Sequence, residues 1–493
     1  MLTVYILLIR QTAGKTMSRL SRRRFLGGSV AAGAALWAPY AQAVGANNDV
    51  RVAVVGLHGR GKNLITLFSQ VDGVRIGALC DVDSQVLDGQ LQRLKGQGQR
   101  PTAYTDVRKL LEDNSIDAVV IATPNHWHSL MGIWACQAGK DVYVEKPVSQ
   151  NLWEGGQLVA AARKYDSIVA SGTQNRSEVG LQQVMQYLQA GSIGKIRVAR
   201  GLCYNRRKSI GKVDGPQPIP AHIDYDLWSG PAPVKPLMRQ QVHYYWHWDQ
   251  TFGNGDLGNQ GIHEMDLCRW ALGVGHLPPR VLSAGGRFGY VDDGNTANTQ
   301  VTILDYEPAP IIFELRGLPT RAGADEVDKH HGINVGIVVE CEQGYFAGGR
   351  GGGTVYDWDG KVIEHFKDPG QSHQANFIDA VRSRDRSQLS AEIEEGHLSS
   401  ALCHMANTAY RLARPAAPDR IAESLKDRPL AADAISRMVK HLQANKIDLE
   451  QSGLAISKSL QWNGQTQQFK NAEEANRLLT RDYRPGFTVP ETV

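Results

Sequence analysis

Short apolar runs alternate with longer mixed segments across the first third of the chain. The runs stand at Val52–Val55, Val74–Cys80, Asp117–Ala122, Val142–Val144 and Ile168–Ser171. Apolar strands of this length, separated by stretches long enough for a helix, are typical of a parallel sheet with helices on both faces. The pattern therefore predicts an N-terminal, doubly wound α/β domain.

The pattern changes after a predicted amphipathic helix at residues 178–190. Longer β segments follow at residues 195–204, 281–290, 297–305, 310–317 and 333–340. Asp359-Gly360 is a typical hairpin turn between two more such segments. These features predict a second α/β domain with a large, open, mostly antiparallel sheet. We expect a long loop at residues 205–240 and a mobile, glycine-rich connection at residues 346–353.

The N-terminus has the order of a twin-arginine export signal. The run Ser21-Arg22-Arg23-Arg24-Phe25-Leu26 precedes a mildly apolar stretch at Gly27–Trp37, and Ala41-Gln42-Ala43 has the form of a cleavage site. We expect export to the periplasm by the twin-arginine machinery, in a folded state, from a start at Met1 or Met17. No cysteine stands at the cleavage site, so we expect no stable membrane anchor.

These patterns divide the chain into four predicted parts. Residues 1–43 are the signal, residues 44–172 the first domain, residues 173–440 the second domain, which also serves oligomerisation, and residues 441–493 a docking tail. The roughly 450 residues after the signal are enough for two or three domains with proper cores.

Charge and cysteine content narrow the choice of partners. The formal net charge of +4 includes the basic signal, so the remaining chain is near neutral and we expect no nucleic-acid partner. The six cysteines are scattered without a C-x-x-C pair. Most lie in apolar segments, so we interpret them as core residues and expect no metal site.

A glycine turn follows the first predicted strand. Gly56, Gly59 and Gly61 have the spacing G-x-x-G-x-G and precede a predicted helix. Glycines let the backbone turn sharply and approach a pyrophosphate, to which the helix N-terminus offers free N–H groups. Together with His58 and Arg60, they form the candidate cofactor-binding turn.

Asp81 follows the second predicted strand, about 20 residues beyond the turn, where an acid can accept hydrogen bonds from ribose hydroxyls. Its charge would repel a 2′-phosphate, so we predict NAD in preference to NADP. Arg60 keeps NADP from being excluded outright.

Polar residues follow two further predicted strands. Thr123, Asn125 and His128 follow one, and Glu145 and Lys146 follow the next. Ligands of open α/β sheets bind at such strand ends, so we expect all five beside the cofactor. For His128, as for the neighbouring His126, a structural role is an equal alternative. A lysine in this crevice can hydrogen-bond a substrate hydroxyl and transfer its proton.

The glycine turn, the TPNHWH segment at residues 123–128 and the EKP segment at residues 145–147 together resemble the glucose–fructose oxidoreductase, inositol dehydrogenase and rhizopine-catabolism family (Gfo/Idh/MocA). The resemblance covers essentially the whole chain after the signal. It implies an N-terminal Rossmann domain, a C-terminal open-sheet domain, and chemistry on a sugar or cyclitol between them. Lys146 would be the family's catalytic-site lysine.

Residues 253–270 match the family's catalytic helix with one departure. His263 stands where the family has a histidine, and Asp266 matches a frequent acid one turn later. Asn259 occupies the usual aspartate position and cannot act as a base. We therefore expect His263 to be the acid/base group, with a pKa near the working pH. Asp256 is a possible substitute carboxylate or a helix cap, and Asp266 is equally readable as a helix neighbour of His263.

Two segments are candidates for substrate contact. Trp246 and His247 belong to the run HYYWHWD, which fits a sugar-stacking platform and a packed loop equally well. Residues 172–176 resemble the family's nicotinamide-side segment, so Arg176 or Gln174 would reach cofactor or substrate.

Three functions fit these residues. The first is an NAD-dependent oxidoreductase acting on a carbohydrate or polyol, with tightly bound, internally recycled cofactor. The second is an NAD-dependent glycosidase that uses transient oxidation and elimination. The third is a sugar-binding protein with a vestigial NAD site. In each case we expect a homo-oligomer.

Overall fold

The computed structural model describes residues 49–370, 372–451 and 453–493. The predicted export signal and its cleavage site lie outside these residues. None of the helices in the described part of the chain combines the length and apolar character needed to cross a bilayer.

A parallel sheet of six strands forms the first domain, in the order β3-β2-β1-β4-β5-β6. Its strands are β1 (Val50–Val55), β2 (Val74–Cys80), β3 (Thr102–Tyr104), β4 (Ala118–Ile121), β5 (Asp141–Val144) and β6 (Val169–Ser171). The intervening helices are α2 (Arg60–Ser69), α3 (Ser84–Gly96), α4 (Val107–Leu111), α5 (Asn125–Gln137) and α6 (Leu152–Lys164). The predicted doubly wound domain is confirmed, and only the short, largely exposed β3 was not anticipated.

The apolar runs are continuous because both faces of this sheet are covered. Val52 and Val54 belong to the core that contains Leu64 of α2. Ala53 and Val55 face the other way, into the core that contains Leu130 and Ile133 of α5. A strand buried on both faces has no place for the polar alternation of a half-exposed strand.

A larger sheet of mixed direction forms the second domain. Its strands are β7 (Ile196–Tyr204), β8 (Arg280–Gly286), β9 (Thr299–Asp305), β10 (Ile311–Arg316), β11 (Val335–Cys341), β12 (Gly344–Gly349), β13 (Gly352–Asp357), β14 (Val362–Lys367), β15 (Arg414–Pro415), β16 (Ala455–Ile456), β17 (Leu460–Asn463) and β18 (Gln468–Phe469). All pairs are antiparallel except β7 with β10, so the predicted mostly antiparallel sheet is confirmed.

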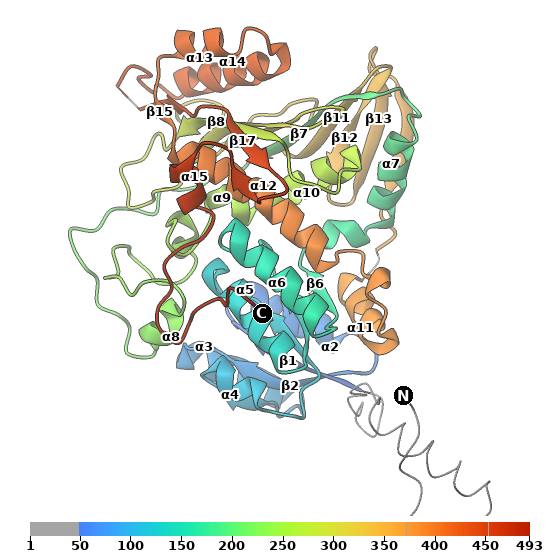
Figure 1. Cartoon of the computed structure of the whole chain (residues 1–493), viewed down its shortest axis with the longest axis vertical. Helices are drawn as coiled ribbons and strands as arrows, with labels where there is room; N and C mark the ends of the chain where they lie inside the picture. The colour runs from blue at the N-terminus through green and yellow to red at the C-terminus, as the bar shows by residue number, and fades with distance from the viewer. Residues whose placement is uncertain (1–48, 371, 452) are drawn as a thin grey trace, which may run out of the picture. The chain divides into compact units, whose positions relative to one another are not determined.

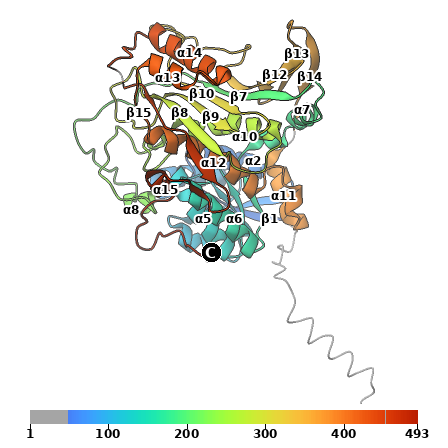
Figure 2. The same ribbon diagram turned by 45° about the horizontal axis from the view of Figure 1, so that its top comes forward.

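Helices cover both faces of this second sheet. α10 (Gly261–Leu272) and α12 (Ile393–Arg411) lie between the sheet and the first domain (Figure 1). α13 (Pro418–Ser424) and α14 (Pro429–Ala444) lie on the opposite face, where their apolar side chains pack against β8, β9 and β10 (Figure 2). α7 (Val179–Gln189) begins within one residue of the predicted helix.

The glycine-rich residues 346–353 are not a mobile connection, which corrects the prediction. They form the adjoining ends of β12 and β13, with Gly348 paired to Gly353. A Cβ atom at Gly352 would lie 2.0 Å from the Phe366 carbonyl oxygen of β14, so close strand approach requires glycine there. The predicted hairpin turn at Asp359-Gly360 is confirmed, because β13 pairs with β14 around it.

The C-terminal residues return to the first domain. After α15 (Glu473–Arg477) the chain runs back beside α5, as the red trace in Figure 1 shows. The Phe487 ring packs against Trp127 and Trp134 of α5, with ring centroids 5.6 and 6.4 Å apart. The first domain therefore completes one of its cores with residues from the end of the chain.

Candidate functional site

The glycine turn between β1 and α2 is shaped by close backbone packing. A Cβ atom at Gly56, which has φ +80°, would lie 2.8 Å from the backbone of Ala122 and Thr123. A Cβ atom at Gly61 would lie 1.7 Å from the Gly56 carbonyl oxygen. Gly56, His58, Gly59 and Arg60 line one pocket, and Gly61 packs against Gly56 instead of lining it. The first turn of α2 therefore stands at the wall of that pocket.

Asp81 lies in the same pocket, at the end of β2. One carboxylate oxygen accepts a hydrogen bond from the Leu57 N–H at 2.7 Å, and the other accepts from the Asp83 N–H at 2.9 Å. Burial raises the pKa of Asp81. Each carboxylate oxygen can accept a further bond, so the side chain is both fixed and able to take two ribose hydroxyls.

The ends of β4 and β5 supply the neighbouring wall, which Thr123, Asn125 and His128 line. The His128 ring joins the two ends, with Nδ1 2.6 Å from the Pro147 carbonyl oxygen and Nε2 2.7 Å from that of Thr123. His126 lies 2.9 Å from the Trp228 carbonyl oxygen, deep in the protein. The contacts of both histidines fit the structural alternative.

Glu145 crosses the pocket to reach Arg60. Its Oε1 atom lies 2.7 Å from Arg60 Nε and 3.2 Å from Gln174 Nε2. Glu145 stands at the end of β5, and Asp81 stands at the end of β2 on the other side of β1. The Arg60 guanidinium is therefore held by an acid on the side of β1 away from Asp81.

Lys146 connects the two domains. Its Nζ atom donates to the Asn259 carbonyl oxygen at 2.5 Å, at the end of α9 (Gly255–Asn259), and both residues line the pocket. Burial lowers the pKa of Lys146. A lysine with a lowered pKa is more readily present as the neutral amine, which is the form that can accept a proton as a general base.

A buried ion pair holds the Asn259 side of this contact. The Arg207 guanidinium binds both carboxylate oxygens of Asp256, at 2.7 and 2.8 Å. Asn259 donates from Nδ2 to Asp256 at 3.3 Å. Asp256 is 1% exposed and does not line the pocket, so it fixes α9 instead of meeting a substrate.

His263 lies in the first turn of α10, outside the pocket lining. Its Nδ1 atom is buried without a partner in the described residues. Burial, and after it the charge of Lys146, lowers the pKa of His263 well below its usual value. The expectation of a pKa near the working pH is wrong, since low solvation and nearby positive charge both favour the neutral imidazole.

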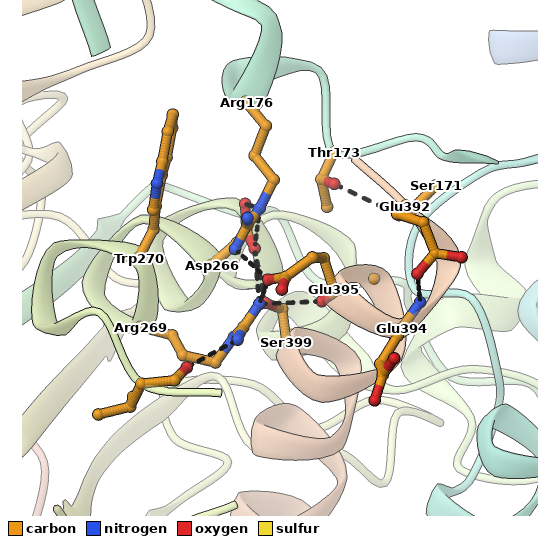
Figure 3. A network of polar contacts seen from close by, with 12 residues as sticks. Ser171, Thr173, Arg176, Asp266, Arg269, Trp270, Glu392, Glu394, Glu395 and Ser399 are labelled. Atoms are coloured by element: carbon orange, nitrogen blue, oxygen red, sulfur yellow. Dashed lines mark hydrogen bonds and ion pairs between the residues drawn. The ribbon is translucent and has the colours of Figure 1, made fainter. Parts of the chain in front are cut away.

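Arg176 and Asp266 bind each other (Figure 3). Arg176 Nε lies 2.9 Å from both Asp266 oxygens, and the Ser399 hydroxyl donates to Asp266 at 2.6 Å. Arg176 also pairs with Glu395 at 3.0 Å and lies over the Trp270 ring. Neither residue lines the pocket. The expected substrate role of Arg176 and catalytic role of Asp266 are corrected here, because the pair joins the end of the first domain to α10 and α12.

The aromatic run divides into two parts. Trp246 lines the pocket, together with Trp228 and the unexpected His243 and Tyr244. His247 points elsewhere, which corrects its expected contact with substrate. Its Nδ1 atom lies against the Tyr244 carbonyl oxygen, and burial lowers its pKa to about 4. A run in which aromatic and histidine residues alternate could not reveal which of them face the pocket.

Residues 205–250 fold over the pocket and are attached to the turn after β2. The His222 Nδ1 and His243 Nε2 atoms lie 2.9 and 2.8 Å from the two carboxylate oxygens of Asp83. The His243 ring stacks on His58 of the glycine turn, with centroids 4.7 Å apart and planes 1° apart. Backbone bonds from Asp224 to Val82, and from Ser84 to His222, add to this attachment. We expected a loop over residues 205–240 and a sugar platform or packed loop over residues 243–249, and we call residues 205–250 the covering segment.

Two family models match the chain. Residues 50–173 match the NAD-binding Rossmann-fold domain of the GFO_IDH_MocA oxidoreductase family, and residues 182–296 match the C-terminal alpha/beta domain of an oxidoreductase family, GFO_IDH_MocA_C2. Every residue that lines the pocket described above lies within one of these two matches.

Two curated relatives differ in how much they share with the chain. A myo-inositol 2-dehydrogenase of Thermotoga maritima is 23% identical over 363 residues, which are 70% of this chain and 91% of the relative. A glycosyl hydrolase family 109 protein of Shewanella pealeana is 38% identical over 122 residues. That second match spans only 27% of the relative and 24% of this chain.

Solved structures share the fold. The WlbA dehydrogenase of Bordetella pertussis, solved in complex with NADH and UDP-GlcNAcA, has a TM-score of 0.53 and 20% sequence identity. The match covers 74% of this chain and 96% of that one.

The Arg176–Asp266 pair should matter for stability and not for cofactor binding. Arg176→Ala removes the nearest cation from the buried Asp266 carboxylate and leaves it the Ser399 hydroxyl and Arg269 at 3.9 Å. The loss of unfolding free energy should therefore be at most about 3–5 kcal/mol, which is typical of a broken buried pair. Urea denaturation measures this loss, with the exposed Arg197→Ala as the matched control. A variant that keeps its stability but loses bound cofactor would contradict the structural assignment.

Proposed function

We propose that the chain, whose residues 50–173 and 182–296 match models of the Gfo/Idh/MocA oxidoreductase family, is an NAD-dependent enzyme for a carbohydrate or polyol that keeps its cofactor bound. The observation that carries the proposal is a pocket that the dinucleotide-type glycine turn, Lys146 and residues of the covering segment line together. The first choice of reaction is oxidation and reduction of sugar hydroxyl and carbonyl groups.

The pocket residues fit a bound dinucleotide. The tight glycine turn brings the backbone to the α2 N-terminus at the pocket wall, where free N–H groups favour a pyrophosphate. Asp81 retains acceptor capacity for ribose hydroxyls, and its carboxylate would oppose a 2′-phosphate. Arg60 is engaged by Glu145 at 2.7 Å, which weakens the case for NADP that its charge suggested. We therefore propose NAD as the cofactor.

Lys146 is the proposed proton acceptor. Bound NAD would supply a hydride acceptor at this edge of the sheet. The Lys146 amine lies on the Asn259 carbonyl oxygen, which fixes its direction while leaving other hydrogen-bonding positions on Nζ free. A substrate hydroxyl placed beside Nζ would pass its proton to the neutral amine as the C–H bond is oxidised. His263 is neutral in its buried position, because its pKa is well below the usual value. It can accept a hydrogen bond, and Lys146 remains the proposed proton acceptor.

A glycosidase outcome is the second candidate. The local similarity to a glycosyl hydrolase family 109 protein favours it, since the matched 122 residues have the higher identity of the two relatives. Oxidation of a hydroxyl two carbons from the anomeric carbon makes the C–H between them acidic, so that elimination of the glycosidic oxygen, addition of water and return of the hydride cleave the bond. A sugar-binding protein with a vestigial NAD site is the third candidate, and the buried, oriented Lys146 counts against it.

A closed cofactor cycle agrees with the proposed location. We propose that the twin-arginine signal at residues 21–26 directs the folded, NAD-loaded protein to the periplasm. Free NAD is scarce there, so an enzyme that exchanged its cofactor at every turnover would stop. An enzyme that returns the hydride to a second sugar, or to the same substrate, needs no free NAD. We also propose a carbohydrate as substrate and further copies of the chain as partners.

Asp81 should determine the cofactor preference. Asp81→Ala removes both the ribose acceptors and the charge that opposes a 2′-phosphate, so it should weaken NAD binding by about 10-fold or more, the cost of roughly one charged hydrogen bond. Equilibrium titration of the stripped protein with NAD and NADP measures the ratio of the two affinities. A wild-type protein that purifies with NADP alone would contradict the preference.

The reaction cycle can be tested without added cofactor. Purified protein, incubated with aldoses, polyols or p-nitrophenyl glycosides, should turn over without NAD in the buffer. Lys146→Met should lower turnover by about 10²-fold or more, as loss of a positioned base does, while NAD stays bound. Arg197→Ala is the matched control for the loss of a cation.

The products separate the two reactions. In deuterated water, a glycosidase incorporates deuterium beside the oxidised carbon and releases a free sugar. A two-sugar oxidoreductase transfers the hydride between sugars without such exchange. A strict need for stoichiometric NAD, with NADH accumulating in solution, would contradict the closed cycle.

A further inference from the structure

A second cleft lies away from the cofactor pocket and shares no lining residue with it. Residues that precede α6, residues 250–254, the C-terminal half of α12 and residues 477–482 form its walls. Its volume of about 490 Å³ is within the range of small-ligand sites. Nothing in the proposed reaction uses this cleft.

Amide and hydroxyl side chains dominate the lining of the cleft. Among them are Gln150, Asn151, Gln250, Asn254, Asn407 and Thr408. Each amide both donates and accepts hydrogen bonds, as sugar hydroxyls do. Several of these amides are already fixed: Asn407 donates to the Asn254 carbonyl oxygen at 3.0 Å, and Gln150 donates to that of Gln250 at 2.8 Å. The lining is therefore preorganised, which reduces the cost of binding.

Two buried polar groups in the lining have no partner among the described residues. They are Asn254 Nδ2 and His404 Nδ1, on side chains of residues that are 5% and 4% exposed. The other ring nitrogen of His404 contacts the Ser149 hydroxyl at 2.9 Å. Both atoms have almost no accessible surface, so a ligand in the cleft meets the other polar atoms of the lining.

Basic side chains outnumber acidic ones around the cleft. The lining contains Lys235, Arg411, Arg477 and Arg481 but only one acid, Asp482. Arg477 and Arg481 are neutralised by Glu473 and Glu154, at 2.6 and 2.8 Å. Arg411, the last residue of α12, has no acidic partner in the described part of the chain. An anionic group would therefore find an unpaired guanidinium beside the amides.

From these observations we propose that the cleft binds an acidic carbohydrate, with its hydroxyls on the amide side chains of the lining and its anionic group on Arg411. Carboxylate and sulfate groups share the required chemistry. The site is connected to the cofactor pocket by α9, because Asn254 precedes this five-residue helix and Asn259, its last residue, holds Lys146. The proposal does not depend on which reaction the cofactor pocket supports.

Calorimetric titration of the full, NAD-containing protein tests the proposal. The probes are trigalacturonic acid, glucose 6-sulfate, the neutral maltotriose and sodium sulfate. At least one acidic saccharide should bind more tightly than maltotriose and sodium sulfate, and which one does so identifies the anionic group. Arg411→Ala should weaken that binding at least 10-fold, and the exposed Arg414→Ala, three residues away, should leave it unchanged.

Asn254→Asp gives a second, independent test. It keeps the size of the side chain but places a negative charge beside the ligand, so it should also weaken binding of the acidic saccharide at least 10-fold. The NAD content and the unfolding midpoint of each variant show whether it has folded. Equal binding of maltotriose or sodium sulfate, binding unchanged in both cleft variants, or no binding of any probe would each overturn the proposal.

Discussion

The contact of Asp83 with His222 and His243 attaches the covering segment to the cofactor-binding domain. Asp83 is 2% exposed, and its N–H donates to Asp81 at 2.9 Å, so the same residue contacts the covering segment and the acid that we propose to bind the ribose. Hydrogen bonds to the buried Asp83 carboxylate are strong, because little water is present to compete for its oxygens. Closure of the pocket and placement of Asp81 are therefore linked through one side chain.

Lys146 makes the second connection between the domains, and it depends on what holds Asn259. The Arg207–Asp256 pair fixes α9 from the covering segment, and α9 presents the carbonyl oxygen that Lys146 binds at 2.5 Å. The covering segment therefore contributes both to the proposed cofactor retention and to the position of the proposed base. This coupling explains why a long segment with little regular structure is attached at so many points.

The sequence predicted what depends on local patterns. Continuous apolar runs predicted the parallel sheet because both its faces are buried, and the glycine spacing predicted a turn that leaves no room for a Cβ atom at Gly56. It could not predict which polar residues face each other across long distances in the chain. Asp266 matched a family position, but its partner Arg176 is 90 residues away. His243 gave no signal beyond an aromatic neighbourhood, since its partner Asp83 lies 160 residues away.

Glycine-rich residues illustrate the same limit. Flexible connections and closely spaced strands both require glycine, so the composition of residues 346–353 could not separate them. The pKa of His263 is another case, because it depends on the burial and charges that the fold creates. Local sequence determined the elements and the cofactor turn, whereas the environment of each site residue came from contacts between distant segments.

The rate at which NAD leaves the protein tests the central claim most directly. Protein loaded with labelled NAD is mixed with excess unlabelled NAD, and the label that remains bound is followed over time. The account predicts slow release from the wild type and release at least 10-fold faster from the His222→Ala/His243→Ala double variant, with the exposed His276→Ala as control. Rapid release from the wild type, or equal rates in all three proteins, would contradict it.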